Sequence, residues 1–322
     1  MIKDGIFNIN KPQNMTSAQV VGAVKRILDV KKVGHTGTLD PMATGVLPIC
    51  VGKAARIMDY LNFDIKEYLC TLRLGLTTDT QDIWGEVIET KPVNVSESDI
   101  IEAFSSFDGI IEQYPPMYSA VRIEGKHLYE YARKGQKPPK EIKKRRIYIE
   151  NLTIENINLD ISEVTFRVRC SKGTYVRTIC QDVGEKLKCG ATMASLCRTA
   201  TGNIKLENSI TLEELEEQKW NKMMSTDYPL VNFGLVIVNQ VSGLRFIAGL
   251  HISKQECLKI EEPKPIDPNL IEFVDKDLLK GYKVYMSTED ENEFLGVAYF
   301  SNKFHKFVAH KVFYRSKNDE SI

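Results

Sequence analysis

The stretch that organises the chain reads Gly34-His35-Thr36-Gly37-Thr38-Leu39-Asp40-Pro41-Met42-Ala43-Thr44-Gly45. Three glycines and one proline within these twelve residues predict a backbone that turns tightly. Pro41 disfavours the α region for Asp40 and has no amide hydrogen that the aspartate side chain could bond. The Asp40 carboxylate is therefore free to act on a partner elsewhere; the alternative is an Asp-Pro turn residue that serves backbone geometry alone.

Regular structure is predicted on both sides of this loop. Before it, Thr16-x-x-Gln19 matches a capping box, and an apolar helical face follows, formed by Val20, Val21, Val24, Ile27 and Leu28. After it, residues 46–51 are an apolar run of strand length, and residues 5–10 predict a further short strand. We therefore expect a fixed loop held between a helix and a buried strand.

The rest of the chain divides into two regions with different predicted secondary structure. In residues 67–74 a strand is predicted whose more apolar face carries Tyr68, Cys70, Leu72 and Leu74. Further strands are predicted at 146–154, 163–170 and 193–199, and helices at 53–61, 96–107, 176–187 and 211–218. After residue 225, short runs broken by Gly, Pro and acidic turns predict a small all-β region; they lie at 235–238, 244–248, 281–286, 294–300 and 305–313. We expect one domain at residues 1–224 and a second at 225–322.

Length, cysteines and the N-terminal segment bound the class of protein. The 322 residues suit one large domain and a smaller one. The seven cysteines include no C-x-x-C pair, and several fall in apolar periodic segments, so free thiols in a reducing compartment are expected. No run of about eighteen apolar residues occurs, and the first residues lack the zones of a signal peptide. These observations predict a cytoplasmic protein without a membrane segment.

Charge is unevenly distributed although the formal net charge is zero. Residues 1–60 carry eight Lys and Arg against four acids, residues 61–121 three against eleven, and residues 122–146 ten against three. The last segment predicts a site for a polyanion such as folded RNA, held by phosphate contacts and by stacking on interleaved tyrosines; the alternative is a solvated charged loop. The cations expected to contact RNA are Lys126, Arg133, Lys134, Lys143, Lys144, Arg145 and Arg146.

We consider the remaining polar groups as metal, cation and nucleophile sites. Asp79 and Asp82, in the turn at 75–85, suggest a cation site, but local hydrogen bonding is favoured because no further ligands occur at calcium-loop spacing. The five histidines show no ligand spacing, and no serine or cysteine nucleophile signature occurs, so we expect no metal site. Arg177 falls in the first turn of a predicted helix, where the dipole disfavours a cation. This suggests a specific anionic partner, the alternative being a surface arginine.

Four motifs occur in order along the chain: GHTGTLDPMATGVLPICVGKA (34–54), EYLCTLRLGLTTDTQDIWG (67–85), PPMYSAVRIEGKHLYEYARKG (115–135) and CSKGTYVRTICQDVG (170–184). Together they closely resemble the bacterial tRNA pseudouridine-55 synthases of the TruB family, over roughly residues 5–220. The resemblance implies an α+β fold, with a mixed, largely antiparallel sheet core and flanking helices. Residues 225–322 resemble a small β-rich PUA-type RNA-binding domain.

The resemblance implies an isomerase that detaches the base of a T-loop uridine from C1′ of the ribose and rejoins it through C5, with no cofactor. It makes Asp40 the nucleophile, paired with Arg177, and stacks Tyr68 on the flipped base. Attack at C1′, attack at the base and support of a glycal-like intermediate all use the same carboxylate. The resemblance therefore assigns the residue and leaves the path open.

Further positions carry over from the same resemblance. His35 matches a histidine that holds the flipped-out nucleotide, the alternative being a loop-capping histidine. Tyr175 and Leu196 match positions that line the pocket, the alternative being two core residues. Segment 122–146 corresponds to an RNA-gripping insertion, in which Arg122 stands where lysine is expected.

The partner implied by the resemblance is tRNA, through its T-loop, with no obligate protein partner. A guide-RNA-dependent enzyme of the dyskerin-like branch is one alternative, although that branch lacks an insertion like 122–146. A protein that mainly binds and folds tRNA is another alternative. The combination of Asp40, Tyr68 and Arg177 disfavours a purely non-catalytic role.

Overall fold

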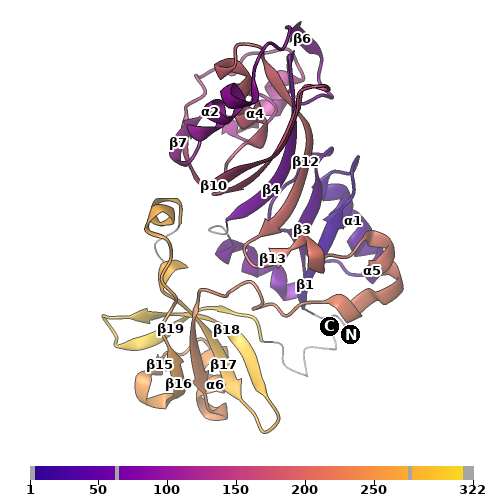
Figure 1. The fold of residues 1–322 in the computed structure, drawn as a ribbon. Coiled ribbons are helices and arrows are strands. Elements are labelled where there is room, and N and C mark those ends of the chain that lie inside the picture. The colour runs from indigo at the N-terminus through magenta and orange to yellow at the C-terminus, as the bar shows by residue number, and fades with distance from the viewer. Residues whose placement is uncertain (1–3, 62–64, 275–277, 315–322) are drawn as a thin grey trace.

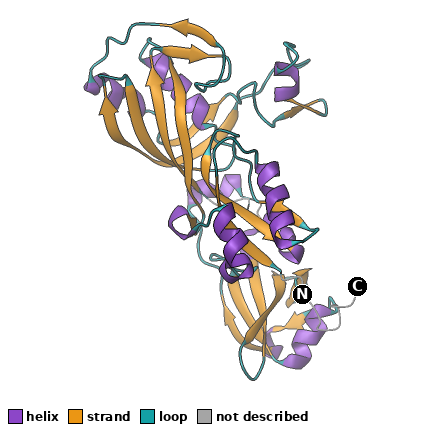
Figure 2. Ribbon diagram, turned by 90° about the vertical axis from the view of Figure 1, so that its right-hand side faces the viewer, coloured by secondary structure: helices purple, strands orange, loops and turns teal. Residues whose placement is uncertain are grey.

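The computed structural model describes residues 4–61, 65–274 and 278–314. Within these ranges most strands belong to two large sheets, of nine and six strands, which follow one another in an elongated molecule (Figure 1, Figure 2). No helix in the described ranges is both long and apolar enough to cross a bilayer. All seven cysteines are free thiols, as the sequence predicts.

The larger sheet has the strand order β1-β3-β12-β4-β11-β10-β7, with β2 on β3 and β13 on β12. Its strands are β1 Gly5–Lys11, β2 Val33–His35, β3 Thr44–Val51, β4 Lys66–Leu74, β7 Gly109–Gln113, β10 Arg145–Asn158, β11 Glu163–Cys170, β12 Ala191–Thr201 and β13 Ile204–Lys205. Neighbours pair antiparallel except β3 and β12, which share a short parallel contact. The expected mixed, largely antiparallel core is confirmed.

Four helices share one hydrophobic core with this sheet: α1 Ser17–Leu28, α2 Glu97–Ser105, α4 Val176–Lys186 and α5 Leu212–Gln218. The predicted capping box is present, because the Thr16 hydroxyl accepts from Gln19 N and the Gln19 side chain accepts from Thr16 N. On β4 the alternation is also confirmed, since Tyr68 and every second residue to Leu74 are buried. The strand therefore carries Tyr68 on the face that packs against the helices.

Short elements connect the longer ones. They are β5 Leu76–Thr78, β6 Val87–Thr90, β8 Arg122–Ile123, β9 Lys126–His127, α3 Leu128–Ala132, η1 Gly52–Tyr60, η2 Leu206–Asn208, η3 Lys219–Lys222, η4 Lys254–Glu256, η5 Pro268–Phe273 and η6 Leu278–Lys280. The helix predicted at 53–61 is the 3₁₀ helix η1. Its nine residues make it longer than most 3₁₀ helices.

The smaller sheet has the order β15-β19-β18-β17-β14-β16. Its strands are β14 Gly234–Val238, β15 Ile252–Ser253, β16 Cys257–Glu261, β17 Gly281–Ser287, β18 Asn292–Ser301 and β19 Lys306–Val312. The expectation of an all-β region is wrong at residues 244–248, which lie mostly in helix α6, Gln240–Ile247. Asn239 caps this helix by accepting from Ser242 N, and Phe246 fixes it to the sheet's core.

The two sheets meet through a mixed hydrophobic cluster. Ile6 of β1 and Tyr60 of η1 pack in the same cluster as Val297 of β18 and Phe313, which directly follows β19. The Tyr60 hydroxyl lies 2.7 Å from Nδ1 of His310, which adds a polar contact between the sheets. Strand β1 is consequently buried on both faces.

Candidate active site

The loop that carries Asp40 lies between β2 and β3, and two side chains bind its backbone. The buried Ser17 hydroxyl, at the start of α1, accepts from Leu39 N at 2.9 Å and lies 3.2 Å from Leu39 O. Lys11 Nζ donates to Pro41 O at 3.0 Å. These contacts hold the residues before and after Asp40, whose own side chain remains 40% exposed.

Lys11 is a fully buried cation that sequence reasoning did not single out. Its Nζ also donates to Pro12 O and Met15 O, so three carbonyl oxygens surround it. Burial lowers the Lys11 pKa to about 8, against the opposing effect of the Asp40 charge. The ammonium group thus ties the end of β1 to the Asp40 loop.

Arg177 brings three segments together around Asp40. Its Nη2 lies 3.0 Å from Asp40 Oδ2, and its Nη1 lies 3.7 Å from Asp82 Oδ2. The same guanidinium donates to Thr80 O and to Tyr118 O, each at 2.9 Å. With its side chain only 6% exposed, Arg177 has the specific anionic partner that its position at the helix start suggests.

Asp82 is a second carboxylate held by local hydrogen bonds, as favoured from the sequence. It accepts from the Thr80 hydroxyl at 2.7 Å and from Trp84 N at 3.3 Å. Burial raises the Asp82 pKa, while the Thr80 hydrogen bond and the Arg177 charge lower it. The contact with Arg177 was not visible in the sequence, because 95 residues separate the two positions (177 minus 82).

A cavity of about 450 Å³ opens beside Asp40, within the size range of small-ligand sites. It brings together five of the residues expected at the site: Asp40, Tyr68, Tyr175, Arg177 and Leu196. Its wall also includes residues that the sequence did not single out as site residues, among them Lys66, Tyr118, Ser119, Tyr129 and Arg198. Five predicted positions, drawn from four separate segments of the chain, therefore share one pocket.

Two predicted residues are affected by a neighbouring buried arginine. Burial raises the pKa of Tyr68, and the Arg198 charge opposes this rise. Burial lowers the pKa of His35, and Arg198 lowers it further, which keeps the imidazole neutral near pH 7. His35 does not line the cavity; it ends β2, directly before Thr36, which does.

The basic segment 122–146 is exposed and only partly neutralised. Lys144 lies 3.7 Å from Glu112, and Arg146 lies 3.1 Å from Glu272 of η5. Within the described ranges no ion pair involves the other five cations expected to contact RNA: Lys126, Arg133, Lys134, Lys143 and Arg145. Five of the seven predicted RNA contacts thus keep a positive charge that no ion pair neutralises.

An aromatic stack joins the basic segment to the cavity. The Tyr129 ring stacks on His127, with centroids 5.1 Å apart and planes inclined by 12°. The Arg133 guanidinium lies 5.2 Å from the centre of the same Tyr129 ring. Because Tyr129 also lines the cavity, the cationic surface begins at the rim of the Asp40 pocket.

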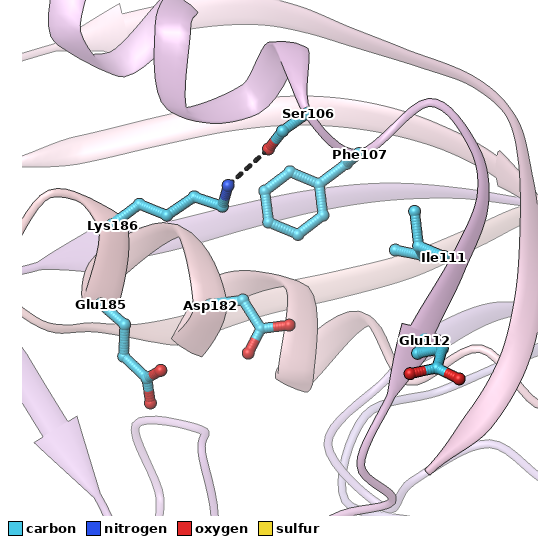
Figure 3. A pocket seen from close by; sticks show the side chains of 7 residues that line it. All are labelled: Ser106, Phe107, Ile111, Glu112, Asp182, Glu185 and Lys186. Atoms are coloured by element: carbon cyan, nitrogen blue, oxygen red, sulfur yellow. Dashed lines mark hydrogen bonds between the residues drawn. The ribbon is translucent and has the colours of Figure 1, made fainter.

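A second cavity of about 450 Å³ lies between α2, β7 and α4 (Figure 3). Its polar groups include Asp182, Glu185 and Glu112, with Lys186 donating to the Ser106 hydroxyl at 2.7 Å. Burial, together with the Glu185 charge, raises the Asp182 pKa to about 6. A wall with three carboxyl groups and one lysine repels a polyanion, so the Asp40 cavity is the better candidate.

Among the described residues, no group of three or more His, Cys, Asp or Glu side chains is arranged to hold a metal ion.

Comparison with known proteins adds independent information. The family model described as "TruB family pseudouridylate synthase (N terminal domain)" matches residues 25–176, and "tRNA pseudouridylate synthase B C-terminal domain" matches residues 177–231. The chain is 44% identical over 311 residues to tRNA pseudouridine synthase B of Clostridium kluyveri, covering 96% of this chain and 99% of that protein. It is 42% identical over 306 residues to the protein of the same name from Clostridium acetobutylicum, covering 95% and 98%.

Solved structures show the same fold at lower identity. A chain in the crystal structure of a Cbf5-Nop10-Gar1 complex superposes with a TM-score of 0.69 at 24% identity, covering 96% of this chain and 84% of that one. A chain in an H/ACA RNP bound to a substrate RNA containing 2′-deoxyuridine gives 0.69 at 24%, covering 97% and 86%. These likenesses extend across both sheets of the present structure.

Proposed function

The chain belongs to the TruB family of pseudouridylate synthases, and we propose that it converts uridine to pseudouridine at position 55, in the T-loop of tRNA. The relatives named tRNA pseudouridine synthase B support the RNA class. The single observation that carries the chemistry is the Asp40 carboxylate, 3.0 Å from Arg177 at the wall of a cavity that Tyr68 also lines.

The reaction is an isomerisation and balances without a co-reactant. The bond between N1 and C1′ breaks, a bond between C5 and C1′ forms, the C5 hydrogen leaves as a proton, and N1 takes up a proton. Asp40 acts as the nucleophile, and the Arg177 guanidinium favours its ionised form and holds its orientation. Lys11 and Ser17 support the loop that carries it.

The target base must leave its stack before it reaches Asp40, because stacking and pairing in the folded RNA hide C1′ and C5. In this proposal the Tyr68 ring replaces the lost stacking, and Tyr175 and Leu196 close the pocket around the base. His35 supports the flipped-out nucleotide from the start of the loop, as a neutral imidazole. Each of these groups lies at or next to the cavity wall.

The five predicted RNA contacts of segment 122–146 that form no ion pair among the described residues grip the RNA backbone near the pocket. Residues 225–322 act as a second RNA-binding domain in this proposal. On its surface Lys254 lies 4.4 Å from the centre of the Phe300 ring, and Lys303 lies 5.5 Å from that of Phe304. Paired cations and rings of this kind suit phosphate contact and stacking. We place this activity in the cytoplasm, without an obligate protein partner.

The test uses the purified chain and an unmodified tRNA transcript. After incubation, the RNA is digested and its nucleosides are separated, with the modified position mapped in parallel. We expect one pseudouridine per tRNA, and none in a matched transcript whose T-loop uridine is replaced by cytidine. Conversion that requires an added guide RNA would favour the dyskerin-like alternative, and improved tRNA folding without any pseudouridine would favour an RNA-folding role.

A further inference from the structure

Arg198, on β12, is a buried arginine without an acidic partner. Only 1% of its surface is exposed, and it is among the largest fully buried side chains of the protein. No carboxylate within the described ranges forms an ion pair with it. Arginine is rarely buried unless it is paired with an acid. Arg198 is satisfied by hydrogen bonds to other groups, and their position in the fold points to its role.

These hydrogen bonds go to the two ends of the Asp40 loop. Arg198 Nε donates to Val46 O at 2.7 Å, and Nη2 donates to Gly37 O at 3.2 Å. Gly37 lies three residues before Asp40 and Val46 six residues after it. One planar guanidinium therefore spans the base of the loop, as a fork of fixed geometry that holds both strand-side ends.

The backbone of Arg198 contacts the same loop. Arg198 and Gly45 face each other in the parallel contact between β12 and β3. Gly45 has a φ of +98°, and a Cβ built on it would lie 2.2 Å from Arg198 O. Glycine at position 45 thus allows β12 to approach the loop closely enough for the side chain to reach Gly37.

The remaining neighbours of the guanidinium belong to the pocket. Arg198 lines the Asp40 cavity and faces Tyr68 across the β12–β4 pairing. Its charge acts on both Tyr68 and His35. The same side chain therefore touches the loop of the nucleophile, and adjoins the ring expected to stack on the base.

We propose that Arg198 is a positioning residue, which braces both ends of the Asp40 loop and so fixes the carboxylate relative to Tyr68 and Arg177. Its catalytic consequence rests on the function proposed above. Its structural consequence, the rigidity of residues 37–46, does not. The two can therefore be measured separately.

The first test replaces the fork by a point charge. Arg198→Lys keeps the charge but reaches only one of the two carbonyl groups, and Arg198→Gln keeps a donor without the charge. The matched control is Arg73→Lys on neighbouring β4, where the side chain is 46% exposed and pairs with Glu163. Amide hydrogen exchange is followed in peptides that cover residues 36–46, in the protein without RNA, together with thermal unfolding.

We expect both Arg198 variants to exchange at least tenfold faster in 36–46, with unchanged protection in β10 and β11, and Arg73→Lys to match the wild type. In single-turnover assays on tRNA, the Arg198 variants should react about 100-fold more slowly, the loss typical of a misplaced reacting group. Their tRNA dissociation constants should stay within twofold of the wild-type value. This split separates positioning from RNA binding.

Unchanged exchange in 36–46 would overturn the proposal, and so would a wild-type single-turnover rate in Arg198→Lys. Faster exchange across the whole sheet, or failure of both Arg198 variants to fold, would also overturn it, because the guanidinium would then support the sheet as a whole. A wild-type chain that modifies no tRNA would refute the proposed function and leave the exchange experiment valid.

Discussion

Arg177 is held between two carboxylates, so its removal should affect stability and activity through different partners. The Arg177→Met substitution leaves Asp82, 15% exposed, without its cation, whereas Asp40 is 40% exposed and remains solvated. Removing one partner of a buried pair typically costs about 3–5 kcal/mol. Since Asp82 is partly exposed and accepts two other hydrogen bonds, we expect a loss of about 3 kcal/mol in the free energy of unfolding.

A second substitution separates the two effects. Asp82→Asn removes the unpaired charge, so the double variant Arg177→Met/Asp82→Asn should recover about 2 kcal/mol of that loss. Activity should not recover, because Asp40 still lacks the guanidinium that holds it 3.0 Å away. We expect single-turnover rates at least 100-fold below wild type in both variants.

Urea unfolding followed by tryptophan fluorescence measures the first effect, and tRNA single turnover measures the second. Asp82→Asn alone is the control, and should lose less than about 1 kcal/mol because Arg177 keeps Asp40 and two carbonyl acceptors. Equal stability of Arg177→Met and the double variant would refute the reasoning, since the cost would then not arise from Asp82. Recovery of activity in the double variant would refute the role given to the Arg177–Asp40 pair.

Three further outcomes follow from single contacts. Lys143→Ala should reduce the slope of log Kd against log salt for tRNA by about one. Arg146→Ala should reduce this slope less, because Arg146 already contacts Glu272. The same slope in the two variants would contradict this prediction. His35→Gln should flatten the stability profile below pH 6.5, since a His35 pKa lowered by folding contributes stability above pH 6.5 that is lost as pH falls toward the folded pKa; an unchanged urea profile would argue against it. Tyr148→Phe, which removes a 3.1 Å hydrogen bond to the C-terminal region, should cost about 1 kcal/mol in urea unfolding, and no loss would show that the bond is neutral.

The sequence predicts local structure well where a pattern runs for a full element. The alternation from Tyr68 to Leu74 is long enough to identify β4, and the Thr16–Gln19 capping box marks the start of α1. Residues 244–248 are too short a run to separate a strand from a helix by periodicity. The stronger signal was Asn239, a favoured cap residue that begins α6 five residues before that run.

The site was predictable in its motifs and unpredictable in its contacts. Local turn chemistry alone favours a structural role for Asp40, and only the family resemblance points to Arg177 as its partner. The contacts of Arg198 with Gly37 and Val46 span 161 and 152 positions of the chain, so no local pattern reveals them. Lys11 likewise lies at the end of a short strand, and its hydrogen bond to Pro41 O appears only in the folded chain.

The central claim is that Asp40 carries out the isomerisation. Release of tritium from tRNA labelled at C5 of uridine tests it most directly, because forming the bond between C5 and C1′ expels the C5 hydrogen. Asp40→Asn keeps the size of the side chain and removes its charge, and its binding to tRNA and unfolding midpoint serve as controls. We predict release by the wild-type chain alone and none above background by folded, tRNA-binding Asp40→Asn. Release by Asp40→Asn at a rate near that of the wild type would contradict the account.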